Sequence, residues 1–235
     1  ELTPENLQPM YFEHPRMKFA LCFDGGIVNQ HDVNMELQAQ GALFQSTSSC
    51  ETLAHLLIRE EGDCLDVLAK VLPKLDGAYT YLILLKDRLL AMRDPLGLMP
   101  LSLGKVDDGY IVASETCALD LLGATFIRDV EPGEIIEISQ EGIRSKHFAK
   151  APNTAHCAME YVYFARPDSQ LNGLGVHQIR QRCGEILAQE SWVPSDIVVG
   201  VPESSLAAAR GYAMESGLPL EPGLLKNKYS GRSFI

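Results

Sequence analysis

The 235-residue chain has little positive charge. Its 20 Lys and Arg residues stand against 31 Asp and Glu, which gives a formal net charge of −11. Nucleic-acid backbones are held mainly by clustered Lys and Arg, so this balance argues against a general nucleic-acid-binding protein. A phosphorylated small molecule remains compatible with the composition, because backbone amides and a few local cations can hold it in an acidic protein.

The chain also lacks a long hydrophobic run. No apolar stretch approaches the length of a membrane span, and no charged-then-apolar leader opens the sequence. Hydrophobic residues make up 46% and charged residues 22%, which is ordinary for a soluble globular protein. We therefore expect a soluble protein with no membrane partner, long enough for one large domain or two modest ones.

Paired cysteines are missing as well. The six cysteines are dispersed and form no Cys-x-x-Cys pair, and the six histidines are equally scattered. This pattern favours free thiols in a reducing cytoplasm over a disulfide framework. No zinc-ligand spacing is present, so a self-contained metal site is not expected.

The first 150 residues combine amphipathic helices with short strands. Residues 1–16 are polar and punctuated by proline, and we predict a loop there. Asp32 as a cap and Gly41 as a stop predict a helix over residues 32–40. Apolar residues at helical spacing predict two more, over residues 51–59 and 65–75. Apolar or alternating runs predict strands, over residues 17–23, 78–85, 88–92, 110–113 and 134–138. The close spacing of the later strands favours antiparallel sheets covered by helices over a doubly wound fold.

A polar segment around Ala151-Pro-Asn153 predicts a domain boundary, so we expect domains over residues 1–150 and 151–235. Beyond it, the sequence predicts a strand–turn–helix–strand beginning of a βαβ unit. Its elements are a helix over 174–190, a buried parallel strand over 197–201, a helix over 204–215 and a second strand from Leu218.

Two segments of this second part are candidates for phosphate binding. The turn Val199-Gly-Val-Pro-Glu-Ser-Ser205 precedes a predicted helix, and small residues with exposed amides there suit a pyrophosphate. The alternative is a plain helix cap with proline in the first turn. Near the end of the chain, Lys226, Lys228 and Arg232 alternate with small and aromatic residues. They form either a ligand-closing loop or a solvated basic end.

Two runs resemble the amidophosphoribosyltransferase family. They are Tyr161-Val-Tyr-Phe-Ala-Arg-Pro-Asp-Ser169, similar to the opening helix of that family's phosphoribosyltransferase half, and Lys226-Asn-Lys-Tyr-Ser-Gly-Arg-Ser-Phe-Ile235, similar to its mobile loop. Earlier in the chain, three segments resemble the glutaminase domain of the N-terminal-nucleophile amidotransferases. These are Arg93-Asp-Pro-Leu-Gly97, Ala113-Ser-Glu-Thr116 and Val130-Glu-Pro-Gly-Glu134, each of which alone is ordinary turn chemistry.

The resemblance implies an α/β (α+β) chain. Residues 1–150 would form a partial αββα glutaminase-like domain lacking its N-terminal part, and residues 151–235 the first part of a type I phosphoribosyltransferase domain. The implied reaction transfers glutamine-derived ammonia to phosphoribosyl pyrophosphate and gives phosphoribosylamine, the first step of de novo purine synthesis. Mg²⁺ would bridge the pyrophosphate. The implied partners are phosphoribosyl pyrophosphate and glutamine or ammonia, in a homo-oligomer.

The resemblance also assigns individual residues. Substrate would be bound by the turn and by the basic segment, through Pro202, Glu203, Ser204, Ser205, Lys226, Lys228, Tyr229 and Arg232. Cys157 stands at a position that binds a [4Fe–4S] cluster in one branch of the family, with a buried free thiol as the alternative.

Several glutaminase residues depart from the family pattern. Glu1 stands where the chain would need the nucleophilic cysteine, and the acidic ribose-phosphate motif is not in these residues. Asp24 replaces the oxyanion-hole asparagine, although Gly25 still offers its backbone N–H, and Ser49 replaces the aspartate that holds the glutamine ammonium. Cys22 and Cys50 are expected to be packing residues rather than substitute nucleophiles.

Three hypotheses follow. The chain is a truncated form of such an enzyme, or a degenerate relative, or the product of a decayed gene without a stable fold. The degenerate relative has a dead glutaminase and either accepts free ammonia or acts only as a binding or regulatory protein. The replacements at Asp24 and Ser49, and that of the family's histidine by Phe23, favour it, because truncation does not change residue identity.

Overall fold

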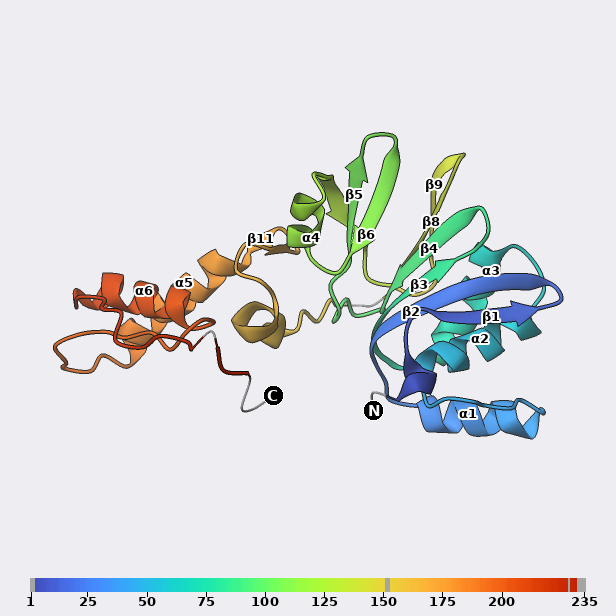
Figure 1. Ribbon diagram of the computed structural model, residues 1–235, viewed down its shortest axis with the longest axis horizontal. Helices are drawn as coiled ribbons and strands as arrows, with labels where there is room; N and C mark the ends of the chain where they lie inside the picture. Colours follow the sequence, from blue (N-terminus) through green and yellow to red (C-terminus); the bar gives the residue numbers. More distant parts are fainter. Residues whose placement is uncertain (1–2, 151–152, 228, 232–235) are drawn as a thin grey trace. The chain divides into compact units, whose positions relative to one another are not determined.

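The computed structural model describes residues 3–150, 153–227 and 229–231 (Figure 1). The chain divides into two compact units. Unit 1 comprises Glu1–Ser114 and Ala118–His156, and unit 2 comprises Glu115–Cys117 and Cys157–Ile235. Each is described separately below.

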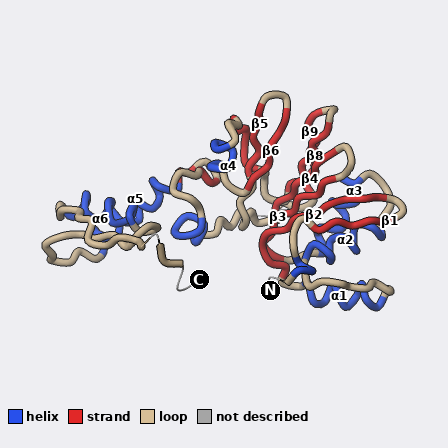
Figure 2. The backbone as a smooth tube through the Cα atoms, viewed as in Figure 1, coloured by secondary structure: helices blue, strands red, loops and turns tan. Residues whose placement is uncertain are grey.

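A six-stranded antiparallel sheet forms the centre of unit 1, in the order β1-β2-β3-β4-β8-β9 (Figure 2). Its strands are β1 (Met10–His14), β2 (Met17–Ile27), β3 (Gly77–Leu84), β4 (Arg88–Arg93), β8 (Glu134–Ser139) and β9 (Gly142–His147). The predicted antiparallel pairing is confirmed. The prediction of a loop over residues 1–16 was wrong at β1, because β1 pairs with β2 through its backbone and packs Met10 and Phe12 against the core.

Three helices cover one face of this sheet: α1 (Gln30–Ala39), α2 (Ser49–Arg59) and α3 (Cys64–Val71) (Figure 1). Their apolar stripes meet the sheet in one core that contains Leu53 and Leu68 from the helices and Ile83 from β3. The predicted third helix ends four residues early. Pro73 lacks a backbone N–H, and residues Leu72–Lys74 continue as a 3₁₀ turn.

A second, three-stranded sheet packs on the other face of the first. It has the order β6-β5-β7 and consists of β5 (Ser102–Val106), β6 (Gly109–Ala113) and β7 (Thr125–Asp129). Leu103 of β5 meets Ala91 and Ile136 of the large sheet in a second core. Leu119 of the short helix α4 (Thr116–Leu121) covers the outer side of β5 next to Gly104. The layers therefore run helix, sheet, sheet, helix, which agrees with the predicted αββα arrangement.

Unit 2 contains a five-residue π-helix η3 (Glu160–Phe164), the short strands β10 (Gln170–Leu171) and β11 (Leu174–Gly175), and helices α5 (Val176–Glu190) and α6 (Leu206–Ser216). The expected opening helix over 161–169 is therefore only η3 followed by a turn.

The buried strand predicted over 197–201 is not formed. Only Val198 pairs there, in one parallel bridge to Leu220, and both Ile197 and Val201 are exposed. An apolar run becomes a two-sided buried strand only where neighbouring strands and helices cover it, and the described part of unit 2 supplies a single bridge.

An ion pair between the half-buried Arg128 and the buried Glu134 makes the stability of unit 1 depend on pH. Arg128 donates two hydrogen bonds to the Glu134 carboxylate at 2.7 Å each, and the Glu131 N–H adds a third at 2.8 Å. Burial raises the pKa of Glu134, but the Arg128 hydrogen bonds and the Glu131 amide outweigh it and lower the pKa overall. The ionised form is thus favoured in the folded state, so its stabilisation is full above the unfolded pKa and is lost as the pH falls through the folded one.

We expect Glu134→Gln to destabilise the chain by about 2 kcal/mol at pH 7, because it removes a charge-assisted buried pair. The difference from the wild type should shrink below about pH 4, as the wild-type carboxylate becomes protonated. Urea unfolding at a series of pH values measures it, with the exposed Glu141→Gln as control. A difference between wild type and Glu134→Gln that is independent of pH would contradict the linkage.

Candidate functional site

The three glutaminase-like positions lie in unit 1 at the end of β2 and the start of α2. Asp24 is exposed on β2, opposite Thr80 of β3. Gly25 follows with φ +126°, and a Cβ there would lie 2.1 Å from the Ala78 carbonyl oxygen. Only glycine fits this backbone. The strand therefore presents the Gly25 backbone together with a carboxylate, and that carboxylate repels a developing oxyanion unless it is protonated.

Ser49 is engaged in packing and has no charge to offer. Its side chain is buried, and its hydroxyl donates to Gln30 Oε1 at 2.7 Å. Its carbonyl accepts from the Tyr81 hydroxyl at 3.2 Å, while the neighbouring Ser48 caps α2 by accepting the Cys50 N–H. Since a substrate ammonium group needs an anionic partner, Ser49 does not supply what the family's aspartate would.

Neither nearby thiol is activated. Cys50 is fully buried, and burial raises its pKa to about 11, an effect that the hydrogen bond with Ser48 only partly offsets. Burial also raises the pKa of Cys22. A thiol that stays protonated at neutral pH is a poor nucleophile, so the geometry agrees with a packing role for both cysteines.

This difference predicts the order in which the cysteines react. At pH 8, only about one thousandth of Cys50 is ionised, whereas Cys183 on α5 is exposed. We expect an aromatic disulfide reagent to modify Cys183 at least about 100-fold faster than Cys50 in the native chain. Peptide mapping after short exposure measures it, and Cys183→Ser should abolish the fast label. Rapid labelling of Cys50 in the folded protein would contradict this description.

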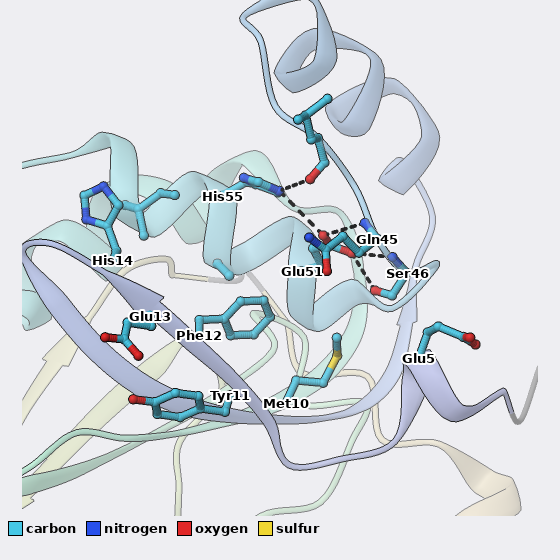
Figure 3. Close-up of a pocket in the computed structure, with 13 residues that line it drawn as sticks. Glu5, Met10, Tyr11, Phe12, Glu13, His14, Gln45, Ser46, Glu51 and His55 are labelled. Carbon is cyan, nitrogen blue, oxygen red and sulfur yellow. Dashed lines mark hydrogen bonds and ion pairs between the residues drawn. The ribbon is translucent and has the colours of Figure 1, made fainter.

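A pocket of about 490 Å³ lies between β1 and α2, and none of Asp24, Gly25 and Ser49 lines it (Figure 3). Glu51 holds the loop before α2: its Oε1 accepts the Gln45 N–H at 2.8 Å, and its Oε2 accepts the Ser46 N–H at 2.7 Å and hydroxyl at 2.6 Å. The His55 Nε2 lies 3.8 Å from Glu51 Oε1 and 3.3 Å from the Leu43 carbonyl oxygen. Sequence reasoning missed this cluster, although Ser48-x-x-Glu51 is the pattern of a helix-start capping box.

The Arg93-Asp94 motif is structural. The Arg93 side chain is almost fully buried, and its Nε, Nη1 and Nη2 donate to the carbonyl oxygens of Met99, Val130 and Gly97 at 2.6, 2.9 and 3.0 Å. The buried Asp94 carboxylate accepts three backbone N–H groups of the following loop, from Leu96, Leu98 and Met99. The motif closes a loop on itself and leaves no carboxylate oxygen facing a ligand.

The candidate phosphate-binding residues lie in unit 2. Pro202–Ser205 form the turn that leads into α6, where Ser205 Oγ donates to the Val201 carbonyl oxygen at 2.5 Å. Lys226 Nζ lies 3.8 Å from Glu203 Oε2, so the structure brings the basic segment and the turn together. Tyr229 is fully exposed. Lys228 and Arg232 lie outside the described residues.

Cys157 is half-buried in unit 2, and its carbonyl accepts the Glu160 N–H. Among the residues that the structure describes, no group of three or more His, Cys, Asp or Glu side chains is arranged to hold a metal ion. Those residues therefore do not form a cluster site around Cys157. Within the same described ranges, no helix has both the length and the apolar character needed to cross a membrane.

Known proteins resemble this chain in both sequence and structure. A family model described as "Glutamine amidotransferase domain" matches residues 1–121, just over half of the chain. The chain belongs to this family. Its fold agrees, since the αββα layers of unit 1 are those expected of an N-terminal-nucleophile glutaminase-like domain.

The chain is similar to the amidophosphoribosyltransferase of Bacillus subtilis (strain 168). The two are 47% identical over 233 residues, which cover 98% of this chain and 49% of the relative. The amidophosphoribosyltransferase of Staphylococcus aureus (strain MRSA252) is 46% identical over 98% of this chain and 47% of its own length. The chain thus spans about half the length of the curated relatives it matches.

Two solved structures give the same result. The glutamine phosphoribosylpyrophosphate amidotransferase from B. subtilis, complexed with ADP and GMP, matches with a TM-score of 0.95 at 46% identity, over 100% of this chain and 52% of that one. A structure described as the allosteric regulatory enzyme of purine biosynthesis matches with a TM-score of 0.94 at 46% identity, over 98% of this chain and 50% of that one. The resemblance and the fold class predicted from the sequence are confirmed.

Proposed function

We propose that the protein containing this chain catalyses the reaction for which its relatives are named, forming phosphoribosylamine from phosphoribosyl pyrophosphate and ammonia. A C–N bond forms at C1 of the sugar as the C–O bond to pyrophosphate breaks. Pyrophosphate leaves with the electron pair, and the new ammonium group releases one proton to solvent to give the amine. The observation that carries the proposal is the Pro202–Ser205 turn at the start of α6, with Lys226 3.8 Å from Glu203.

The turn suits a departing pyrophosphate. The backbone N–H groups of the first turn and the positive end of the α6 dipole favour an anion there. Ser204 adds a hydroxyl donor, whereas the Ser205 hydroxyl already donates to the Val201 carbonyl oxygen. Glu203 and Lys226 are both exposed, so their ion pair contributes little energy. Lys226 is therefore free to exchange the Glu203 carboxylate for a phosphate oxygen, which carries more charge. This exchange draws the basic segment over the substrate and excludes water from the reacting carbon.

Magnesium enters the proposal as a partner of the substrate. The described residues offer the turn one carboxylate, Glu203, beside serine hydroxyls, and they form no three-ligand metal group. Mg²⁺ would thus take most of its oxygen ligands from the pyrophosphate and water. When bound, it offsets negative charge on the leaving group. The described residues give no comparable support to a [4Fe–4S] cluster, and Cys157 as its ligand stays a prediction.

Location and assembly are also proposals. We place the protein in the cytoplasm, since its six cysteines are free thiols. Self-association would cover the apolar side chains that unit 1 exposes, among them Val28 and Leu43, each more than 80% exposed. Sedimentation of a clean monomer would argue against it.

A second candidate keeps the sugar chemistry but lacks glutamine hydrolysis. Asp24 places a carboxylate where the oxyanion would develop, and the buried Ser49 hydroxyl is bound to Gln30. These two positions favour a relative with a dead glutaminase, which uses free ammonia or acts as a binding or regulatory protein.

One assay separates the candidates. The protein, expressed from its complete reading frame, is supplied with Mg²⁺, phosphoribosyl pyrophosphate and either glutamine or an ammonium salt, and phosphoribosylamine is measured. From Asp24 and Ser49 we expect product with ammonium and at least about 100-fold less with glutamine, the size of effect caused by losing one oxyanion donor. Equal rates would show a working glutaminase. No product from either source, in protein shown to be folded, would overturn the proposed function.

A further inference from the structure

Glu115 and the first two residues of α4, Thr116 and Cys117, belong to unit 2. The chain leaves unit 1 after Ser114 and returns to it at Ala118. In between, Glu115 Oε2 accepts the Arg166 backbone N–H at 2.8 Å and the Ser169 hydroxyl at 2.7 Å. Thr116 Oγ1 accepts the Gln170 N–H at 2.8 Å. Two side chains from a distant part of the sequence therefore hold both ends of the 166–170 turn.

The 166–170 turn also accepts hydrogen bonds from the first backbone N–H groups of α5. The Ser169 carbonyl accepts the Val176 N–H, and the Pro167 carbonyl accepts the His177 N–H, each at 3.0 Å. The first N–H groups of a helix have no partner inside it, and the residue before α5, Gly175, has no side chain that could cap it. The 166–170 turn takes the place of the missing cap.

The Glu115 carboxylate also compensates the charge of a buried arginine of α5. Arg180 of α5 is 4% exposed and donates to the carbonyl oxygens of Tyr161 at 2.6 Å and Ala165 at 2.7 Å. Burial lowers the pKa of Arg180, and the nearby Glu115 carboxylate acts in the opposite direction. Glu115 is thus the anion that offsets the positive charge of the Arg180 guanidinium, whose hydrogen bonds go to neutral carbonyl groups.

Helix α5 in turn fixes α6. A Cβ on Gly184 would lie 1.8 Å from the Ala208 carbonyl oxygen, and one on Gly211 would lie 1.9 Å from that of Gln181. The two backbones therefore touch, and the helices cannot shift independently. Since α6 begins directly after Ser205, its placement sets that of the Pro202–Ser205 turn.

We propose that Glu115 is a positioning residue for the Pro202–Ser205 turn, acting through the 166–170 turn and the start of α5. Its effect on ligand binding rests on the proposed function, whereas its effect on α5 does not. Loss of Glu115 frees Arg166 and Ser169, weakens the cap of α5 and lets the α5–α6 pair move as a body.

The test compares Glu115→Ala, Glu115→Gln and the exposed unit 1 control Glu141→Ala. Amide hydrogen exchange is followed at Val176 and His177, and the affinity for magnesium pyrophosphate is measured by calorimetry. Glu115→Ala should speed exchange at these two amides about tenfold or more, since lost hydrogen bonds of about 1.4 kcal/mol correspond to tenfold. Affinity should fall several-fold. Glu115→Gln, which retains an acceptor oxygen, should recover part of both, and Glu141→Ala should change neither.

Each possible result supports or overturns the role proposed for Glu115. Unchanged exchange at Val176 and His177 in Glu115→Ala overturns the proposal. So does uniform acceleration of every unit 2 amide in both Glu115 variants, because Glu115 would then only stabilise the unit. If Glu115→Ala fails to fold, Glu115→Gln and Thr116→Val carry the same comparison. If the wild type does not bind magnesium pyrophosphate, the proposed function fails, while the exchange data still decide whether Glu115 positions α5.

Discussion

Gly184→Val should abolish the native packing of unit 2. The new Cβ would fall 1.8 Å from the Ala208 carbonyl oxygen and 2.9 Å from the Tyr212 nitrogen, both of them backbone atoms of α6. Backbone cannot rotate aside as a flexible side chain does, so the helices must separate and expose their buried face. We expect a loss of more than about 3 kcal/mol, above the usual range for overpacking.

Trp192 makes this measurement specific, because it is the single tryptophan of the chain and follows α5 in unit 2. Urea unfolding followed by its fluorescence should show a large loss for Gly184→Val. Cys183→Val is the matched control, since it places the same β-branched side chain at the adjacent, exposed position. Equal stability of the two variants would show that the helices do not pack at Gly184.

Arg93→Ala should be the most damaging single truncation in unit 1. It strips hydrogen bonds from three carbonyl oxygens, those of Met99, Val130 and Gly97, and leaves a void at a site only 2% exposed. Unsatisfied buried groups cost about 1–3 kcal/mol each and partly relax, so we expect about 3–5 kcal/mol in total.

Circular dichroism of the β-rich unit during urea unfolding measures the loss. Arg93→Lys is an informative companion, because a lysine keeps the charge but lacks the planar fork that reaches three diverging acceptors. It should recover less than half of the stability. Arg88→Ala, a half-buried arginine on the same strand, should cost about 1 kcal/mol or less. Similar effects at Arg88 and Arg93 would contradict the role assigned to the buried guanidinium.

Periodicity predicted the elements that carry a one-sided apolar pattern. Helix α2 and strands β3 and β4 were predicted to within two residues at each end, because Leu53, Leu57 and Ile83 have to face the core that the structure shows. Strands β1 and β9 were missed for the opposite reason. Both are edge strands held by backbone pairing. Strand β1 turns only two partly buried side chains, Met10 and Phe12, toward the core, and β9 carries mostly polar side chains, so the apolar pattern of each is short.

The prediction of a strand over 197–201 failed for a different physical reason. An apolar run shows that a segment seeks burial, but the partners decide whether it becomes a strand. In the described part of unit 2, Val198 finds one partner, Leu220. The parallel direction of that bridge agrees with the predicted βαβ beginning, although the extent of the strand does not.

The sequence predicted some features of the candidate site and missed others. Replacement of charged and amide groups at Asp24 and Ser49 was readable from residue identity, and the structure adds that Ser49 is engaged with Gln30. The pairing of Glu203 with Lys226, 23 positions apart, was not readable, because only the folded chain brings the turn and the basic segment together. The sequence showed Glu115 only as part of the Ala113–Thr116 segment, whereas its partners Arg166 and Ser169 lie more than 50 positions away.

The most direct test of the central claim is calorimetric titration of phosphoribosyl pyrophosphate with Mg²⁺ into the protein expressed from its complete reading frame. We expect saturable one-to-one binding that Ser204→Asp weakens at least about tenfold, since the added carboxylate would face the pyrophosphate at the start of α6. Gln140→Asp, which adds the same charge at an exposed position of unit 1, should bind like the wild type. Absence of saturable binding by folded protein, or binding that Ser204→Asp leaves intact, would contradict the claim that this turn holds the sugar diphosphate.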